Sequence, residues 1–191
     1  FIKIIKIKHM IDNKFKILRQ LGKGSSSRVF LVEDFYSNKV AIKAIRNDRG
    51  YGDQVAAELM EREHFLLEKM ANHPNIIKPY FTQLDGQISY NSKIENIMYM
   101  AMEHADNGSI ADFIAYTGGI EEKCCRLFMA QIWNAIKFLH DQEYAHLDIK
   151  LENILLDKYF NIKIADMGTS VNVAKTKGSS KIKIGTHHYM P

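Results

Sequence analysis

The sequence has few cysteines, few prolines and no long apolar run. Its 191 residues include 2 Cys, 3 Pro and 1 Trp, and the cysteines are neighbours, Cys124 and Cys125. A disulfide between adjacent residues would be strained, and the helical pattern around the pair suggests burial, so we expect a reducing, cytoplasmic setting. No window holds the roughly 18 apolar residues of a membrane span, and lysines interrupt residues 1–8 too often for a signal peptide. These absences exclude a disulfide-stabilised miniprotein and favour a soluble, intracellular protein.

Neither sign of charge dominates. Lys and Arg number 26 against 22 Asp and Glu, which gives a net charge of +4. Nucleic-acid binding would need a basic stripe interleaved with aromatic residues, and none is present, so no nucleic-acid partner is expected. The composition, 46% hydrophobic and 25% charged, is that of a globular protein with one sizeable core or two small ones. Because the chain opens on Phe1 and stops at Met190-Pro191 in an apparent loop, we expect a fragment of something longer; its oligomeric state is open.

The hydrophobic pattern changes from strand to helix after Met102. Apolar runs predict strands at residues 15–21, 29–33, 39–45, 76–81 and 97–102. Asp53 is expected to cap a helix that runs to Met70. A second helix is expected from Gly118-Gly119 to about residue 142, followed by short strands at 153–156 and 162–165. The first helix shows an apolar stripe of Val55, Leu59, Leu66, Leu67 and Met70, and the second shows one of Phe128, Ile132, Ala135, Ile136 and Leu139.

A glycine-rich turn joins the first two predicted strands. It reads Leu21-Gly22-Lys23-Gly24-Ser25-Ser26-Ser27-Arg28-Val29. Glycines let backbone amides come close to phosphate oxygens that a side chain would obstruct. A plain hairpin turn explains the same residues, so the turn alone is weak support for phosphate binding.

The segment Val40-Ala41-Ile42-Lys43 follows strand alternation. Ala41 and Lys43 therefore share one face, where a small residue leaves room for a flat ring and the lysine supplies a charge for its phosphates. A surface lysine on an edge strand is the alternative. Glu63, which falls inside the helical apolar stripe, needs a partner if buried, and Lys43 is the obvious candidate. Glu58 and Glu61 are expected to be solvated.

Two polar motifs follow in the second half. The first is His146-Leu-Asp148-Ile-Lys150-Leu-Glu-Asn153, in which Asp148, Lys150 and Asn153 could converge from one loop as base, cation and metal-facing carbonyl. The second is Asp166-Met167-Gly168, directly after an apolar strand, where a carboxylate suits a hard cation such as Mg²⁺. Ordinary turn chemistry is the alternative for either motif alone.

Taken in order, these motifs resemble the eukaryotic protein kinases, over nearly the whole chain from Ile11 to Pro191. Lys150 in its motif is similar to the serine/threonine branch, and Gly185-Thr-His-His-Tyr-Met-Pro191 resembles the end of the kinase activation segment, broken off. The resemblance implies an α+β, bilobal protein-kinase-like fold: an N-lobe antiparallel sheet plus one helix, then a partial, mostly helical C-lobe. It divides the chain into an N-terminal extension (1–10), an N-lobe (11–102), a hinge (103–108) and a partial C-lobe (109–191).

The resemblance also implies roles for individual residues, with ATP and Mg²⁺ as cofactors and a protein Ser/Thr hydroxyl as acceptor. Lys43 would hold the α and β phosphates and Glu63 would position it. Asp148 would accept or orient the substrate hydroxyl, and Lys150 would neutralise the transferring γ-phosphoryl group. Asn153 and Asp166 would hold Mg²⁺. The ATP contacts would come from the backbone at Gly22, Lys23, Gly24, Ser25, Ser26, Ser27 and Arg28, from the adenine-facing Leu21, Val29, Ala41 and Leu155, from the gatekeeper Met102, and from Glu103 to Ala105.

The sequence departs from the family pattern at three positions. Ser27 replaces the usual third glycine and Met167 the usual Phe, and both changes could be accommodated. Leu147 replaces the usual Arg, which in this family binds an activation-loop phosphate, so we expect activity to depend little on phosphorylation there. Thr176, Ser179, Ser180 and Thr186 lie on that loop, which is expected to be a solvated segment, with a regulatory phosphorylation site as the alternative. The stretch from Leu84 to Asn96 is a longer strand connection than this family needs, and we interpret it as a surface insertion.

Two other functions stay open. An inactive nucleotide-binding pseudokinase or scaffold is disfavoured by the intact Lys43, Asp148, Asn153 and Asp166. A small-molecule kinase of similar fold is disfavoured by Lys150 and the segment that starts at Gly185. The sequence therefore favours an ATP-dependent serine/threonine protein kinase.

Overall fold

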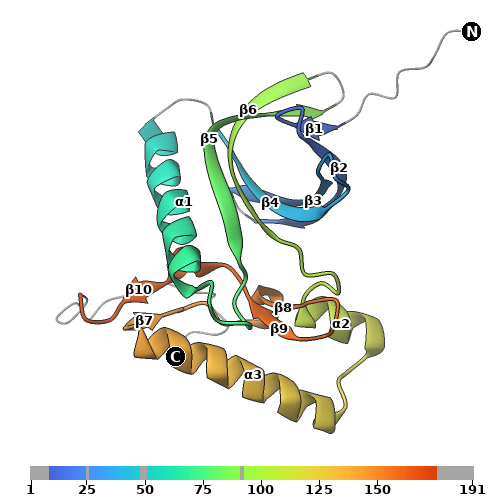
Figure 1. The fold of residues 1–191 in the computed structure, drawn as a ribbon, viewed down its shortest axis with the longest axis vertical. Helices are drawn as coiled ribbons and strands as arrows, with labels where there is room; N and C mark the ends of the chain where they lie inside the picture. Colours follow the sequence, from blue (N-terminus) through green and yellow to red (C-terminus); the bar gives the residue numbers. More distant parts are fainter. Residues whose placement is uncertain (1–8, 25, 48–50, 91–92, 176–191) are drawn as a thin grey trace, which may run out of the picture. The chain divides into compact units, whose positions relative to one another are not determined.

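The computed structural model describes residues 9–24, 26–47, 51–90 and 93–175, and it forms two compact units (Figure 1). The first comprises residues 1–64 and 79–104, and the second comprises residues 65–78 and 105–191. The predicted limits of the extension, lobes and hinge stay predictions. No helix in the described ranges has the length and apolarity needed to cross a membrane.

The first unit is a closed antiparallel barrel (Figure 1). Neighbouring strands follow the order β1-β2-β3-β4-β6-β5, and β1 pairs with both β2 and β5, which closes the ring. Closure satisfies the backbone groups that an open sheet would leave at its edges. The strands are β1 (Met10–Ile11), β2 (Phe15–Lys23), β3 (Ser27–Glu33), β4 (Lys39–Arg46), β5 (Pro79–Tyr90) and β6 (Lys93–Glu103).

Two predictions about β5 and β6 were wrong. The strand expected at residues 76–81 begins only at Pro79, while Ile76 forms an isolated bridge to Ile164 in the second unit. Residues 84–96 were interpreted as a surface insertion, but residues 84–90 and 93–96 belong to the long hairpin strands β5 and β6. Ile88 on this hairpin is 1% exposed, because it faces the barrel core.

A buried tyrosine ties β1 to the hairpin. The Tyr99 hydroxyl donates to Asp12 Oδ2 over 2.8 Å, and Asp12 Oδ1 accepts from the Gln87 amide over 2.6 Å. Burial and the Asp12 carboxylate raise the pKa of Tyr99 well above its usual value. The Tyr99 ring lies against Gly86, where an added Cβ would stand 2.6 Å from ring atom Cε1. Only glycine therefore fits at Gly86.

Helix α1 (Tyr51–Met70) begins two residues before the predicted start, so Asp53 lies in its first turn instead of capping it. The predicted stripe is wrong at its N-terminal end, since Val55 is 47% exposed and Leu59 50% exposed. Glu58 and Glu61 are exposed, as predicted. The buried face contains Met60, Glu63, Leu66, Leu67 and Met70.

The second unit contains two main helices and short strands. The sequence did not predict α2 (Ile110–Thr117), which a capping box starts: the Ser109 hydroxyl accepts from the Asp112 amide, and Asp112 accepts from the Ser109 amide. Cys124 on α3 is exposed and Cys125 half-buried, so the predicted burial of the cysteine pair is wrong for Cys124. The other elements are α3 (Glu122–Asp141), β7 (Tyr144–Ala145), β8 (Ile154–Leu156), β9 (Ile162–Ile164), β10 (Val171–Asn172) and short 3₁₀ turns at Leu151–Asn153 and Met167–Thr169.

A polar network joins β9 to α3 within this unit. Asn75, in the segment after α1, donates through Nδ2 to Gln131 Oε1 over 3.0 Å and to the Ile162 carbonyl over 2.8 Å. Gln131 Oε1 in turn accepts from the Ile162 amide over 2.7 Å. Because each buried polar group has a partner, the network fixes the strand that leads to Asp166.

Candidate functional site

An ion pair in the first unit joins β4 to α1. Lys43 Nζ lies 2.9 Å from Glu63 Oε1 and 2.8 Å from Oε2. The Glu63 side chain is 6% exposed and that of Lys43 17% exposed. A buried carboxylate is costly without a partner, and the ammonium, held by both oxygens, supplies one. The pairing predicted from the sequence is therefore present in the structure.

Strand register gathers the candidate ring-contacting residues on the face that carries Lys43. Ala41 lies opposite Leu31 on β3 and Met102 on β6, and Lys43 lies opposite Val29 and Met100. Directly opposite residues share a face, so all six side chains are on one side of the sheet. The alternate residues face the barrel core, which includes Phe30, Val40, Ile42, Tyr99 and Ala101.

The glycine-rich turn is a tight connection between β2 and β3. Its strands pair Gly22 with Val29 and Lys23 with Arg28, and the Gly24 amide donates to the Ser27 carbonyl over 2.8 Å. Leu21 lies at a break in register and is half-buried. Among the described residues, no atom lies within 4 Å of a Cβ added to Gly22, so their packing does not require glycine there. Ser26 is described and exposed, whereas Ser25 lies outside the described residues.

Asp148, Lys150 and Asn153 converge in the second unit. Lys150 Nζ lies 2.7 Å from Asp148 Oδ2, and Asn153 Nδ2 donates to the same oxygen over 3.0 Å and to the Asp148 carbonyl over 2.9 Å. Asp148 is 7% exposed and Asn153 8%. The two polar partners hold the carboxylate in one orientation. The loop thus places three candidate residues together, as the motif predicted.

His146 holds this loop in place, a role the sequence analysis did not assign. Its Nδ1 accepts from the Asp148 amide over 3.2 Å, and its Nε2 lies 3.1 Å from the Ala165 carbonyl. These partners specify the neutral tautomer with its proton on Nε2, and burial lowers the pKa of His146. Thr169 Oγ1 donates to the His146 carbonyl over 2.9 Å. The sequence feature that could have indicated this role is the position of His146, a polar residue between the apolar residues Ala145 and Leu147 and two positions before Asp148.

Asn153 and Asp166 are brought together by the backbone. The Ala165 amide donates to the Asn153 carbonyl over 2.9 Å, so the end of β9 lies beside Asn153 and Asp166 follows immediately. Because Asn153 Nδ2 faces Asp148, its Oδ1 is directed away from that carboxylate. An amide oxygen beside a carboxylate is a donor set suited to Mg²⁺. Asp166 has a left-handed backbone, φ 64° and ψ 71°, which is uncommon for a non-glycine residue.

The remaining candidate residues are Met102 and Glu103 in the first unit and Ala105 and Leu155 in the second. Met102 is 9% exposed and Glu103 half-buried at the end of β6. Ala105 is 7% exposed, and its carbonyl accepts from the Gly108 amide. Leu155 on β8 is half-buried and bridges Ser109. The structure thus organises the candidate residues as two sets, one in each unit.

Leu147 lies between His146 and Asp148 with φ 65° and is 37% exposed. Bulky residues rarely adopt this left-handed conformation, so the loop geometry constrains Leu147 strongly. The loop residues Thr176, Ser179, Ser180 and Thr186, and the segment from Gly185 to Pro191, lie outside the described residues.

Comparison with known proteins gives a family match and several relatives. The family model "Protein kinase domain" matches residues 15–191. The chain is 31% identical over 172 residues to "Serine/threonine-protein kinase PKH2" of Candida albicans, covering 87% of this chain and 17% of that protein. It is 35% identical over 164 residues to "NUAK family SNF1-like kinase 2" of Homo sapiens, covering 85% of this chain and 24% of that protein.

A third relative, "NUAK family SNF1-like kinase 1" of Mus musculus, is 34% identical over 171 residues, which cover 89% of this chain and 24% of that protein. The chain therefore spans less than a quarter of the length of these relatives. The antiparallel N-lobe sheet with its helix and the helical start of a C-lobe agree with the predicted fold class. Since the family model and these relatives each match most of the chain, the protein belongs to the protein kinase domain family.

Proposed function

We propose that the chain is the catalytic part of a serine/threonine protein kinase, which transfers the γ-phosphoryl group of Mg-ATP to Ser or Thr hydroxyls of proteins. The observation that carries this proposal is the Asp148, Lys150 and Asn153 cluster, in which a buried carboxylate is held by a cation and an amide. Catalysis of phosphoryl transfer is mainly positioning and electrostatics, and this cluster offers a base, a positive charge and a metal-facing oxygen.

Each polar residue of the second unit would have its own role in phosphoryl transfer. Asp148 would accept a hydrogen bond from the acceptor hydroxyl and take its proton at Oδ1 or Oδ2 as the hydroxyl oxygen bonds to the γ-phosphorus. The bond from that phosphorus to the bridging oxygen breaks, and ADP leaves. Lys150 would offset negative charge on the transferred group. Asn153 and Asp166 would hold Mg²⁺, and Mg-ATP supplies the phosphoryl group together with the cation that neutralises its oxygens.

The first unit would bind the rest of the nucleotide. Lys43, oriented by Glu63, would contact the α and β phosphates, and the backbone from Gly22 to Arg28, Ser25 included, would cover them. Leu21, Val29, Ala41 and Leu155 would enclose the adenine ring, while Met102, Glu103 and Ala105 would line its edge. Gly22 supports this assignment, because the fold leaves open space where its side chain would be.

The test is Mg²⁺-dependent transfer of labelled γ-phosphate from ATP to a generic Ser/Thr peptide, measured for this chain and for the full-length protein. Asp148→Asn should lower the rate about 10³-fold, because the base and its charge are lost. Asp141→Asn is a matched control, since Asp141 forms an exposed pair with Lys137 on α3. ATP binding without transfer by either wild-type form would instead identify a nucleotide-binding scaffold.

A further inference from the structure

The barrel carries a pocket that the proposed phosphotransfer does not use. It has a volume of about 780 Å³ and is formed by the start of β2, the β3–β4 turn and the start of β5. This volume lies within the range of ligand-binding sites in proteins. Half of the residues that line it are aromatic. The residues that line it are Lys14, Phe15, Asp34, Phe35, Tyr36, Asn38, Lys39, Val40, Tyr80 and Phe81.

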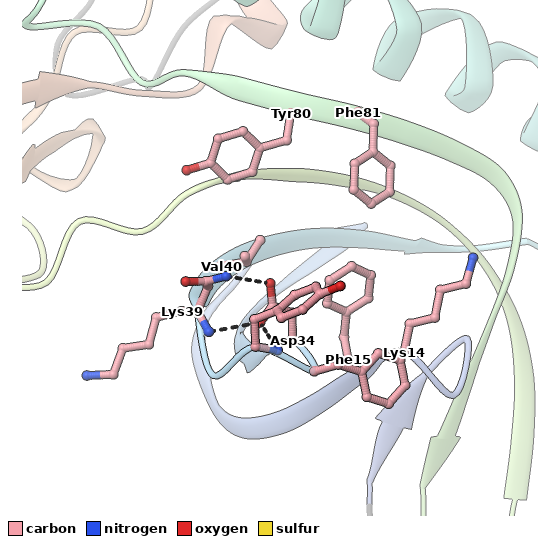
Figure 2. Close-up of a pocket in the computed structure, with 10 residues that line it drawn as sticks. Lys14, Phe15, Asp34, Lys39, Val40, Tyr80 and Phe81 are labelled. Carbon is pink, nitrogen blue, oxygen red and sulfur yellow. Dashed lines mark hydrogen bonds between the residues drawn. The ribbon is translucent and has the colours of Figure 1, made fainter.

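The inner wall of the pocket is anchored in the barrel core. Phe15 is 9% exposed, and its ring stacks against Phe81 at a centroid distance of 6.1 Å. The Phe81 ring also meets the buried Tyr99 ring edge-on at 6.0 Å. Figure 2 shows Tyr80 and Phe81 on one side of the pocket, and Phe15 and the Asp34 turn on the other. An occupant would therefore meet a preformed aromatic wall.

The mouth of the pocket exposes further aromatic side chains. Phe35 is 76% exposed, Tyr36 87% and Tyr80 51%. The turn that carries the first two is fixed, because Asp34 Oδ1 accepts from the amides of Tyr36 and Asn38, each over 2.8 Å. A turn that holds aromatic rings in solvent beside a pocket is typical of a surface that binds another molecule.

Charge at the pocket indicates the chemistry of its occupant. The side chains of Lys14 and Lys39 extend toward opposite ends (Figure 2), and among the described residues neither ammonium group forms an ion pair or hydrogen bond. The one acidic lining residue, Asp34, already accepts three hydrogen bonds from its own turn. Nearby Glu33 lies opposite Lys39 in the sheet, but its carboxylate is 3.6 Å from Lys16. The lysines are thus available to an anionic ligand.

We propose that this pocket binds a segment of a partner protein in which aromatic or aliphatic side chains are flanked on both sides by carboxylates. The apolar side chains would enter between Phe81 and the β3–β4 turn, and the carboxylates would meet Lys14 and Lys39. Residues 1–8 of the chain itself do not fit this description, since they contain three lysines and no acidic residue.

The experiment is a titration followed by fluorescence anisotropy, with a labelled peptide Glu-Asp-Phe-Leu-Asp-Glu and a counterpart in which lysines replace its four acidic residues. The wild-type chain should bind the acidic peptide saturably and more weakly as salt is raised, and it should bind the basic peptide at least about tenfold less tightly. Equal binding of the two peptides, or no saturable binding of the acidic one, would overturn the proposal.

Paired variants locate the binding. Lys14→Glu with Lys39→Glu, and separately Tyr36→Ser, should each weaken binding of the acidic peptide about tenfold. Lys93→Glu with Lys123→Glu, and Tyr116→Ser, are matched controls, because these exposed residues do not line the pocket and should leave binding unchanged. Thermal melts should show that all variants stay folded. If the pocket variants bind normally, or if they instead abolish a dimer seen by sedimentation, the occupant is not an acidic partner segment.

Discussion

Lys43 and Asp148 are both held by oppositely charged partners, but the chain positions them in different ways. Lys43 lies on a central barrel strand, where two ladders fix its neighbours Val29 and Met100. Asp148 lies in a loop, where Lys150, Asn153 and His146 fix it by individual hydrogen bonds. The first residue depends on a cooperative sheet and the second on a few polar contacts.

This difference determines how each region should respond to substitution. Damage to the barrel should spread, because each strand is paired on both sides and the ring is closed by β1. Damage to the loop should stay local and change chemistry before it changes stability, since the loop is held by individual side-chain contacts and not by a sheet. The following predictions test that distinction, from the largest expected effect to the smallest.

Gly86→Ala should destabilise the barrel by about 3 kcal/mol, because the new methyl group would overlap the buried Tyr99 ring. Denaturant unfolding measures this loss. Gly22→Ala is the matched control, since a Cβ there meets nothing and stability should change by less than about 1 kcal/mol. Equal stability of the two variants would show that the hairpin does not close the barrel as described.

Glu63→Gln should slow phosphate transfer about tenfold to a hundredfold, which corresponds to about 1.4 to 2.7 kcal/mol in the barrier. The neutral amide keeps the shape but removes the charge that orients Lys43. Steady-state kinetics with ATP provides the measurement. Glu61→Gln, on an exposed position of the same helix, should have no effect, and a similar loss in both variants would refute a specific role for Glu63.

His146 should make the loop around Asp148 sensitive to mild acid. Its pKa is lowered in the folded protein from the usual value of 6.5, so below that pH the unfolded chain binds a proton that the folded chain does not. Its contribution to stability is therefore present above pH 6.5 and is lost as the pH falls, by at most about 1.4 kcal/mol per pH unit. NMR titration of the His146 ring should give a midpoint below 6.5, and a midpoint above it would contradict this assignment.

The smallest expected effect is that of phosphatase treatment. Since Leu147 stands where the family usually has the phosphate-binding Arg, removing phosphate from the full-length protein should change transfer less than about twofold. Leu147→Arg is the informative variant, because only it should acquire a dependence on phosphorylation. Loss of nearly all wild-type activity after phosphatase treatment would show that another cation performs this role.

The grouping of residues on the strand that carries Lys43 and in the loop that carries Asp148 could be predicted from the sequence, for different physical reasons. Strand alternation placed Ala41 and Lys43 on one face because the period of a strand is two. Spacing in the His146 to Asn153 motif grouped Asp148, Lys150 and Asn153, which a short loop keeps close. Helix α2 and strand β1 were missed, since eight and two residues give too little periodicity.

Other features depend on contacts between distant residues, which local pattern does not reveal. The exposure of Val55 and Leu59 was not predicted, because a helix buries only the face that other elements cover. The strand structure of residues 84–90 and 93–96 was not predicted, because Ile88 and Ser89 pair with Met10–Ile11, more than seventy residues away. The requirement for glycine at Gly86 was not predicted either, because it comes from the Tyr99 ring on a neighbouring strand.

The most direct test of the proposed Mg-ATP binding is calorimetric titration of ATP, with and without Mg²⁺, into the wild type, Lys43→Met and Asp166→Asn. The account predicts that each variant weakens Mg-ATP binding, and that only Asp166→Asn removes the difference that Mg²⁺ makes. Unchanged Mg-ATP affinity in either variant would contradict it, since one of the two residue sets would then have no part in binding the nucleotide.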